Sequence, residues 1–140
     1  MFEIEITPRF GDTDGLKHIN NNHITTWFET AENEFYKLFT PDFSLKNSDW
    51  KLLLVESESQ FIKQTFYGKN VNIKAYIIEV GDDYFITCCE AWQDKELKAI
   101  GKNKYLHYDW INLESIIIPD EIETQLIEHL RSTDKIGIWD

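Results

Sequence analysis

Early in the chain the spacing of apolar residues changes from a strand pattern to a helix pattern. Positions 2, 4 and 6 are apolar and positions 3, 5 and 7 are polar, which predicts a half-buried strand over residues 2–9. From His23 to Phe39 the apolar residues recur every three or four positions, at Ile24, Trp27, Phe28, Ala31, Phe35, Leu38 and Phe39. This stripe predicts a long helix with Glu29, Glu32, Glu34 and Lys37 on its other side.

Turn-forming residues divide the rest of the chain. Residues 10–22 and 40–49 are polar loops, and one of the asparagines at 20–22 is expected to cap the helix. Four strands are predicted over residues 50–66, 69–80, 83–93 and 97–109, as an antiparallel meander with tight turns between them. Pro119 opens a last helical segment, with apolar residues at Ile122, Leu126, Ile127 and Leu130.

These elements predict how the layers pack. A sheet that is apolar on one face must cover that face, and the apolar stripe of the long helix is the available partner. We therefore expect an α+β fold, with an antiparallel five-stranded sheet wrapped around a long central helix and a short C-terminal helix.

Composition limits the possible partners and the compartment. At 140 residues the chain is expected to form a single domain over residues 1–140. Its net charge of −11 argues against binding to nucleic acid or to an anionic membrane surface. The first residues lack the basic and apolar regions of a signal peptide. Cys88 and Cys89 are adjacent, so in a strand they point to opposite faces and a disulfide between them is not expected. We expect a cytoplasmic protein.

Chemically useful side chains gather just before the long helix. Residues 9–23 read R-F-G-D-T-D-G-L-K-H-I-N-N-N-H, with two carboxylates, two histidines and three asparagines. The glycine motifs of nucleotide-binding proteins, the serine nucleophile elbow and the HExxH zinc motif are all missing from the sequence. The junction between strand and helix is therefore the main candidate site.

This junction resembles a known family. Residues 12–21 follow the pattern D-x-D-x-x-x-H-x-N-N and are followed by T-T-W-F-E at residues 25–29. The segment is similar to the hotdog-fold acyl-CoA thioesterases of the 4-hydroxybenzoyl-CoA thioesterase-like superfamily. F-I-K-Q at residues 61–64 and Y-G-K at residues 67–69 also look like that family's second and third strands. The likeness covers about residues 4–108 and implies a hotdog fold, with no metal and no organic cofactor.

The resemblance assigns roles to the motif. Asp14 matches the catalytic carboxylate, which either attacks the thioester carbonyl or activates water. A free aspartate has a pKa of about 3.9 and suits a nucleophile; a general base would gain from burial beside Trp27 and Phe28. The backbone N–H of Asn21, at the helix N-terminus, would face the substrate carbonyl oxygen, with Asn22 as its neighbour.

The other residues of the junction have less specific expectations. His18 either orients the substrate or Asp14, or is simply a turn residue. Asp12 is expected to structure the loop and His23 to begin the helix. Lys17 stands where a small or turn-forming residue is common in the family, and Gln64 occupies a strand position that can be glutamate in relatives.

Acyl-CoA is the implied substrate. Its phosphates need local cations, for which Lys63 and Lys102 are candidates, and Trp27 would lie along the acyl group. The resemblance also implies a homodimer or homotetramer, because hotdog proteins pair their sheets edge to edge.

Three alternatives stay open at this point. The chain could be an acyl-carrier-protein thioesterase, or a non-catalytic hotdog module that binds an acyl ligand or dimerises. A metal site built from Asp12, Asp14, His18 and His23 is a further alternative.

Overall fold

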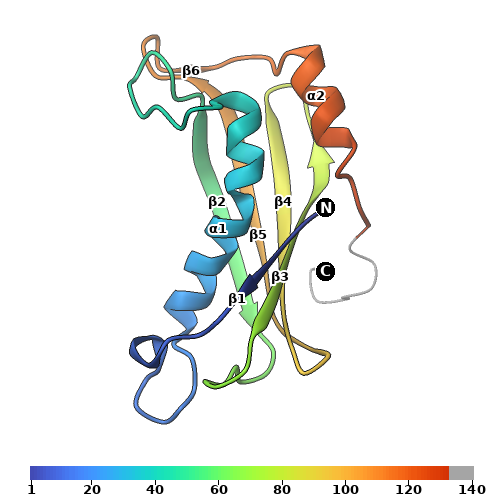
Figure 1. Ribbon diagram of the computed structural model, residues 1–140. Helices are drawn as coiled ribbons and strands as arrows, with labels where there is room; N and C mark the ends of the chain where they lie inside the picture. Colours follow the sequence, from blue (N-terminus) through green and yellow to red (C-terminus); the bar gives the residue numbers. More distant parts are fainter. Residues whose placement is uncertain (133–140) are drawn as a thin grey trace.

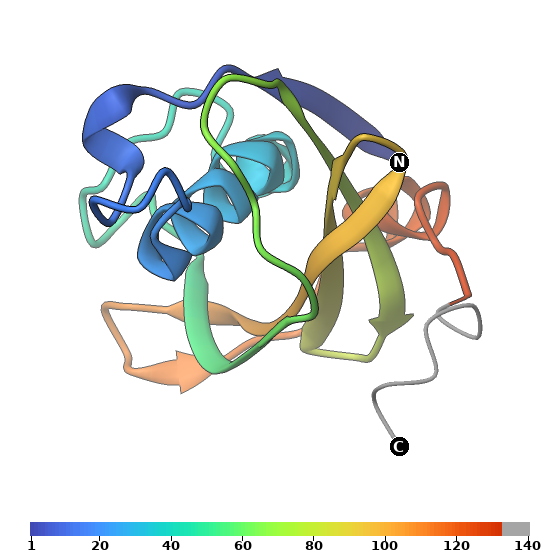
Figure 2. The ribbon, with the colours of Figure 1, turned by 90° about the horizontal axis from the view of Figure 1, so that it is seen from below.

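One long helix lies in the curve of an antiparallel sheet in the computed structural model of the chain (Figures 1 and 2). The structure describes residues 1–132, so residues 133–140 of the expected domain lie outside the described residues. The elements are β1 (Phe2–Ile6), a 3-10 turn η1 (Phe10–Asp12), α1 (Asn21–Phe39), β2 (Leu52–Phe61), β3 (Val71–Val80), β4 (Tyr84–Gln93), β5 (Glu96–Asp109), β6 (Glu114–Ser115) and α2 (Asp120–Ile127). This arrangement confirms the α+β prediction, including the short C-terminal helix.

The order of the strands differs from the predicted four-strand meander. The sheet runs β1-β3-β4-β5-β2, and the two-residue strand β6 pairs with β5. Only β3, β4 and β5 form a meander; β2 pairs with β5 and reaches β3 through the segment of residues 62–70. β2 also ends at Phe61 rather than near residue 66. The chain does turn at Tyr67 and Gly68, but this turn does not join neighbouring strands as predicted, because residues 62–70 cross from one edge of the sheet toward the other.

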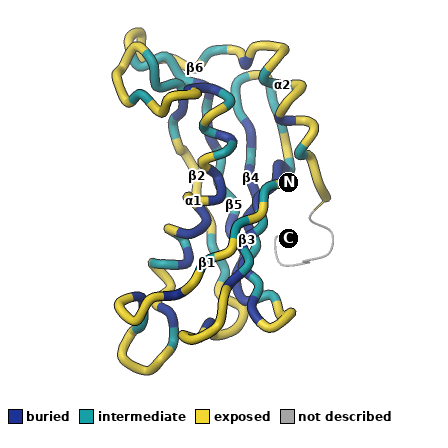
Figure 3. The backbone as a smooth tube through the Cα atoms, in the orientation of Figure 1, coloured by how far each residue is buried: buried dark blue, intermediate teal, exposed yellow. Residues whose placement is uncertain are grey.

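The apolar stripe of α1 packs on the sheet as predicted. Its side chains are buried against the inner-face residues of β3, β4 and β5, while the loops at the lower end of the molecule stay exposed (Figure 3). Gly101 in β5 allows the close approach, because a Cβ there would lie 2.9 Å from the ring of Phe28. The helix begins at Asn21, two residues before the predicted start, with Asn20 as its N-cap.

The prediction that Glu32 faces solvent is wrong. It is fully buried and its carboxyl accepts five hydrogen bonds from the donors of Tyr36, Thr87, Cys89, Asn103 and Tyr105. Position 32 lies four residues after Phe28 and three before Phe35, which places it within the apolar stripe. Burial and the neighbouring Glu32 carboxyl raise the pKa of both tyrosine hydroxyls, so they serve as donors.

The C-terminal segment covers one end of the sheet. α2 buries Leu126 in the core and ends at Ile127. Leu130, predicted as part of this helix, instead forms a parallel bridge with Ile77 of β3. None of the helices within residues 1–132 is both long enough and apolar enough to cross a membrane.

Candidate functional site

The loop before α1 is held against the link between β2 and β3. Backbone N–H groups of Ile19 and Tyr67 donate to the carbonyls of Thr65 (2.8 Å) and Lys17 (2.9 Å), and His18 bridges with Phe66. These bonds fix the N-terminus of α1 beside residues 62–67. Two segments far apart in sequence therefore make one surface at the lower end of Figure 1.

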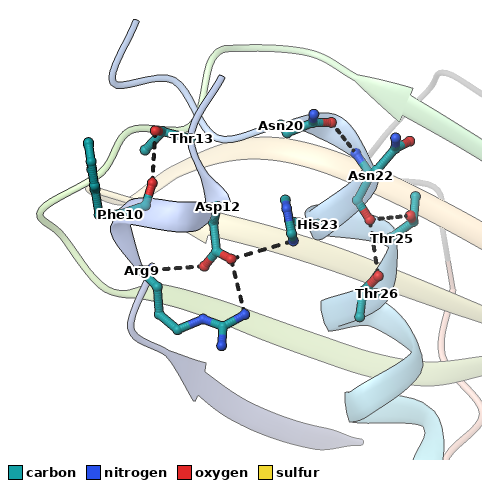
Figure 4. A network of polar contacts seen from close by, with 9 residues as sticks. All are labelled: Arg9, Phe10, Asp12, Thr13, Asn20, Asn22, His23, Thr25 and Thr26. Carbon is teal, nitrogen blue, oxygen red and sulfur yellow. Dashed lines mark hydrogen bonds and ion pairs between the residues drawn. The ribbon is translucent and has the colours of Figure 1, made fainter. Parts of the chain in front are cut away.

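Asp12 is the buried anchor of this loop (Figure 4). Its carboxylate accepts hydrogen bonds from the Arg9 backbone N–H at 2.8 Å and guanidinium at 3.3 Å, and Nδ1 of His23 lies 3.4 Å away. Burial acts to raise the pKa of Asp12, but the Arg9 groups and His23 outweigh it and hold this pKa below its usual value. Asp12 thus structures the loop as expected. His23 does more than begin the helix, because it lies against this carboxylate.

Asp14 lies in a turn at the edge of a hollow of about 260 Å³. The hollow is lined by Asp14, Ile19, Asn20, Asn21 and Gln64. Oδ1 of Asp14 accepts from the Leu16 N–H at 3.0 Å, and its own N–H donates to the His18 carbonyl at 3.0 Å. The structure thus brings together three residues named from the sequence, at positions 14, 21 and 64.

The expected burial of Asp14 is not observed within this single chain. The residue is exposed, and Trp27 and Phe28 are buried in the core instead of lying beside its carboxylate. A carboxylate in this position remains accessible to water and to a substrate.

Asn21 and Asn22, in the first turn of α1, differ in whether their backbone N–H groups are hydrogen-bonded. The N–H of Asn22 donates to Oδ1 of Asn20 at 2.9 Å and is occupied by the cap (Figure 4). The N–H of Asn21 has no acceptor among the described residues, as expected for the first residue of a helix. Asn21 lines the hollow and Asn22 does not. Asn21, with its free N–H, and Asp14 therefore line the same hollow.

Of the remaining candidates, only Gln64 is among the residues that line the hollow. The ring of His18 packs edge-on against Phe66, with 5.2 Å between ring centroids. Trp27 is a core residue, and Lys63 forms a 2.6 Å ion pair with Glu96. Lys102 lies 3.7 Å from Glu58 in another hollow, lined by Glu56, Glu58, Ile86, Lys102 and Lys104. Gln64 does line the hollow, but it belongs to the link after β2 and not to a strand.

Sequence reasoning missed two lining residues, Ile19 and Asn20. The signal for Asn20 was its place as a possible cap, since the N-cap residue adjoins the free N–H groups of the first turn. Ile19 carried no comparable signal.

The four residues considered for a metal do not converge. Only Asp12 and His23 approach each other, and residues 1–132 contain no cluster of three histidine, cysteine, aspartate or glutamate side chains suited to a metal ion.

The comparisons with known proteins agree with the fold. A family model described as the thioesterase-like superfamily matches residues 8–126. A solved structure described as a predicted thioesterase from Bacillus stearothermophilus is 34% identical, with a TM-score of 0.88 over 94% of this chain and 97% of that chain. None of the curated proteins matches the sequence.

Two more distant structures contain CoA. A thioesterase from Thermus thermophilus, complexed with coenzyme A and Zn, is 18% identical, with a TM-score of 0.76 over 94% of this chain and 98% of that one. A hypothetical protein from Staphylococcus aureus in complex with CoA is 15% identical, with a TM-score of 0.80 over 94% and 86% of the two chains. At these identities the likeness shows the shared hotdog fold.

Proposed function

Because the chain belongs to the thioesterase-like superfamily, we propose that it hydrolyses an acyl-CoA thioester to a free acid and CoA. The observation that carries this proposal is the hollow itself. Its lining includes Asp14, an exposed carboxylate, and Asn21, whose backbone N–H at the start of α1 has no acceptor among the described residues.

The chemistry requires a nucleophile and an oxyanion donor. The thioester carbonyl oxygen accepts from the Asn21 N–H, where the positive end of the helix dipole stabilises the negative charge that develops. Asp14 either attacks the carbonyl carbon, forming an anhydride that water opens, or removes a proton from the attacking water. In both routes the C–S bond breaks and the CoA thiolate takes up a proton. Gln64 is proposed to contact the substrate from the facing link, and His18 to support the loop carrying Asp14.

The proposal is tested by thiol release from acyl-CoA esters of short, long and aromatic acyl groups, with and without a chelator. We expect release with at least one ester and no effect of the chelator, since no cofactor is proposed. Release from none of the esters would contradict the activity and favour the carrier-protein or binding-module alternatives.

We also propose that the working form is a homodimer or homotetramer. β2 is an edge strand of the sheet that residues 1–132 form, and its apolar residues Leu54, Val55 and Phe61 are exposed. Pairing of this edge with a second copy would bury these side chains and would help to exclude water from the open hollow.

Light scattering at micromolar concentration is expected to give the mass of two or four chains. A monomer under these conditions would contradict the paired form. Replacing Val55 by lysine should shift the mass toward the monomer, because it places a charge on the edge that pairs.

We propose that residues 1–140 form one domain, supported by the single sheet that the described residues build. We propose a cytoplasmic location, supported by Cys88 and Cys89, which are both buried free thiols.

A further inference from the structure

Several exposed side chains belong to the two chain segments that also supply the lining of the Asp14 hollow. Phe10, Leu16 and Tyr67 are exposed by 73%, 72% and 45%, respectively. The rings of Phe10 and Tyr67 meet edge to face, with 6.1 Å between centroids. The hydrogen bond from the Tyr67 N–H to the Lys17 carbonyl joins the two segments that supply these residues. We call Phe10, Leu16, Lys17 and Tyr67 the junction rim.

Lys17 is held in an unusual conformation within this rim. Its φ of +67° lies in the left-handed region, which is unfavourable for a residue with a Cβ. The turn around it is closed by hydrogen bonds from Asp14 to His18 and from Leu16 to Asp14. These bonds fix the backbone of Lys17 close to the candidate catalytic carboxylate, while its side chain is exposed.

Lys17 also differs from nearby cations in its charge environment. Arg9 is paired with Asp12, Lys63 with Glu96 and Lys69 with Asp94. In residues 1–132 no carboxylate forms an ion pair with Lys17. In a chain of net charge −11, an anionic ligand is attracted to the cation that is not already neutralised.

We propose that the junction rim binds the nucleotide part of CoA, with the Lys17 ammonium group on its phosphates and the exposed rings of Phe10 and Tyr67 against its adenine. This inference rests on the proposed thioesterase function. The pantetheine arm separates the phosphates of CoA from its sulfur, so a phosphate-binding cation belongs on the rim of the hollow and not on its floor. Charge-assisted contact with phosphate and stacking on aromatic rings are the interactions that such a nucleotide offers.

The chain provides a matched control lysine. Lys95 in the β4–β5 turn is exposed, has a φ of +63° and has no ion pair within the described residues. It lines a different hollow, with Trp92 and Asn72. Lys17→Gly and Lys95→Gly each remove one positive charge. Each also introduces glycine at a position with positive φ, which glycine adopts without strain, so both variants are expected to fold.

The test is calorimetric titration of CoA and of pantetheine, which lacks the nucleotide and phosphates, into the wild type and both variants. Lys17→Gly should weaken CoA binding about tenfold and leave pantetheine binding unchanged, since about 1.4 kcal/mol of phosphate contact corresponds to a factor of ten. Lys95→Gly should change neither affinity.

Other outcomes overturn the inference. These are equal losses in the two variants, unchanged CoA binding in Lys17→Gly, or wild-type affinity that is the same for CoA and pantetheine. Because binding is measured without turnover, a failure of hydrolysis would count against the proposed function and not against this site.

Discussion

Asp14→Asn is expected to lower the rate of acyl-CoA hydrolysis by at least about a hundredfold, the low end for loss of a positioned acid–base or nucleophilic group. The amide is a poor nucleophile and a poor base. It has nearly the shape of the carboxylate, and its Oδ1 can still accept the Leu16 N–H that closes the turn. The fold and the Asn21 N–H should therefore be unchanged, so the loss would be chemical. Thiol release with the best ester of the panel measures it.

Asp42→Asn is the matched control. Oδ1 of Asp42 accepts from the N–H of Ser44 two residues later, the same local geometry as Asp14 and Leu16, and Asp42 is also exposed. The same chemical change outside the hollow should leave turnover within a factor of two or so. Turnover by Asp14→Asn equal to that of Asp42→Asn would show that Asp14 is not the catalytic carboxylate. Normal far-ultraviolet circular dichroism of both variants would show that folding is not the cause.

Local patterns predicted the elements, while the contacts between them were harder to predict. A periodic pattern of apolar residues predicts which face of a single helix or strand is buried, as it does for Ile24 to Phe39 and for Phe2 to Ile6. Such a pattern contains no information on which strand pairs with which. β2 and β3 were therefore assumed to be neighbours, whereas the link of residues 62–70 carries the chain past β5 and β4.

The candidate site was predictable where it depends on one short segment. Asp14 and Asn21 belong to one motif, and the structure places both on one hollow. Lys63 and Lys102 were chosen only for charge, and such a choice cannot detect that Glu96 and Glu58 lie beside them. For Lys17 the sequence reveals neither the left-handed backbone conformation nor the absence of an ion pair within residues 1–132.

Glu32 was predicted to face solvent because of its charge, yet it is buried in the core. Its replacement is expected to have the largest effect on stability. Glu32→Ala should lower the free energy of unfolding by about 3–5 kcal/mol. The variant leaves the donors of Thr87, Cys89, Asn103 and Tyr105 without their acceptor in the core, at a cost of about 1–3 kcal/mol for each that finds no substitute. In the variant one of the hydroxyls of Tyr36 and Tyr105, which lie 2.6 Å apart, can donate to the other, and Thr87 can use the Asn103 carbonyl, so the losses should not add in full.

Urea denaturation followed by circular dichroism measures the change, and Glu29→Ala is its control. Glu29 lies on the same helix, is exposed and carries the same charge, so its replacement should shift stability by no more than about 0.5 kcal/mol. Glu32→Gln keeps the volume and one acceptor oxygen and should fall between the two. If Glu32→Ala and Glu29→Ala lost the same small amount, the buried carboxylate would not be what fixes α1 on the sheet. The apolar contacts of Phe28 and Phe35 would then be enough to hold α1 on the sheet, and with it Asn21 at the start of this helix.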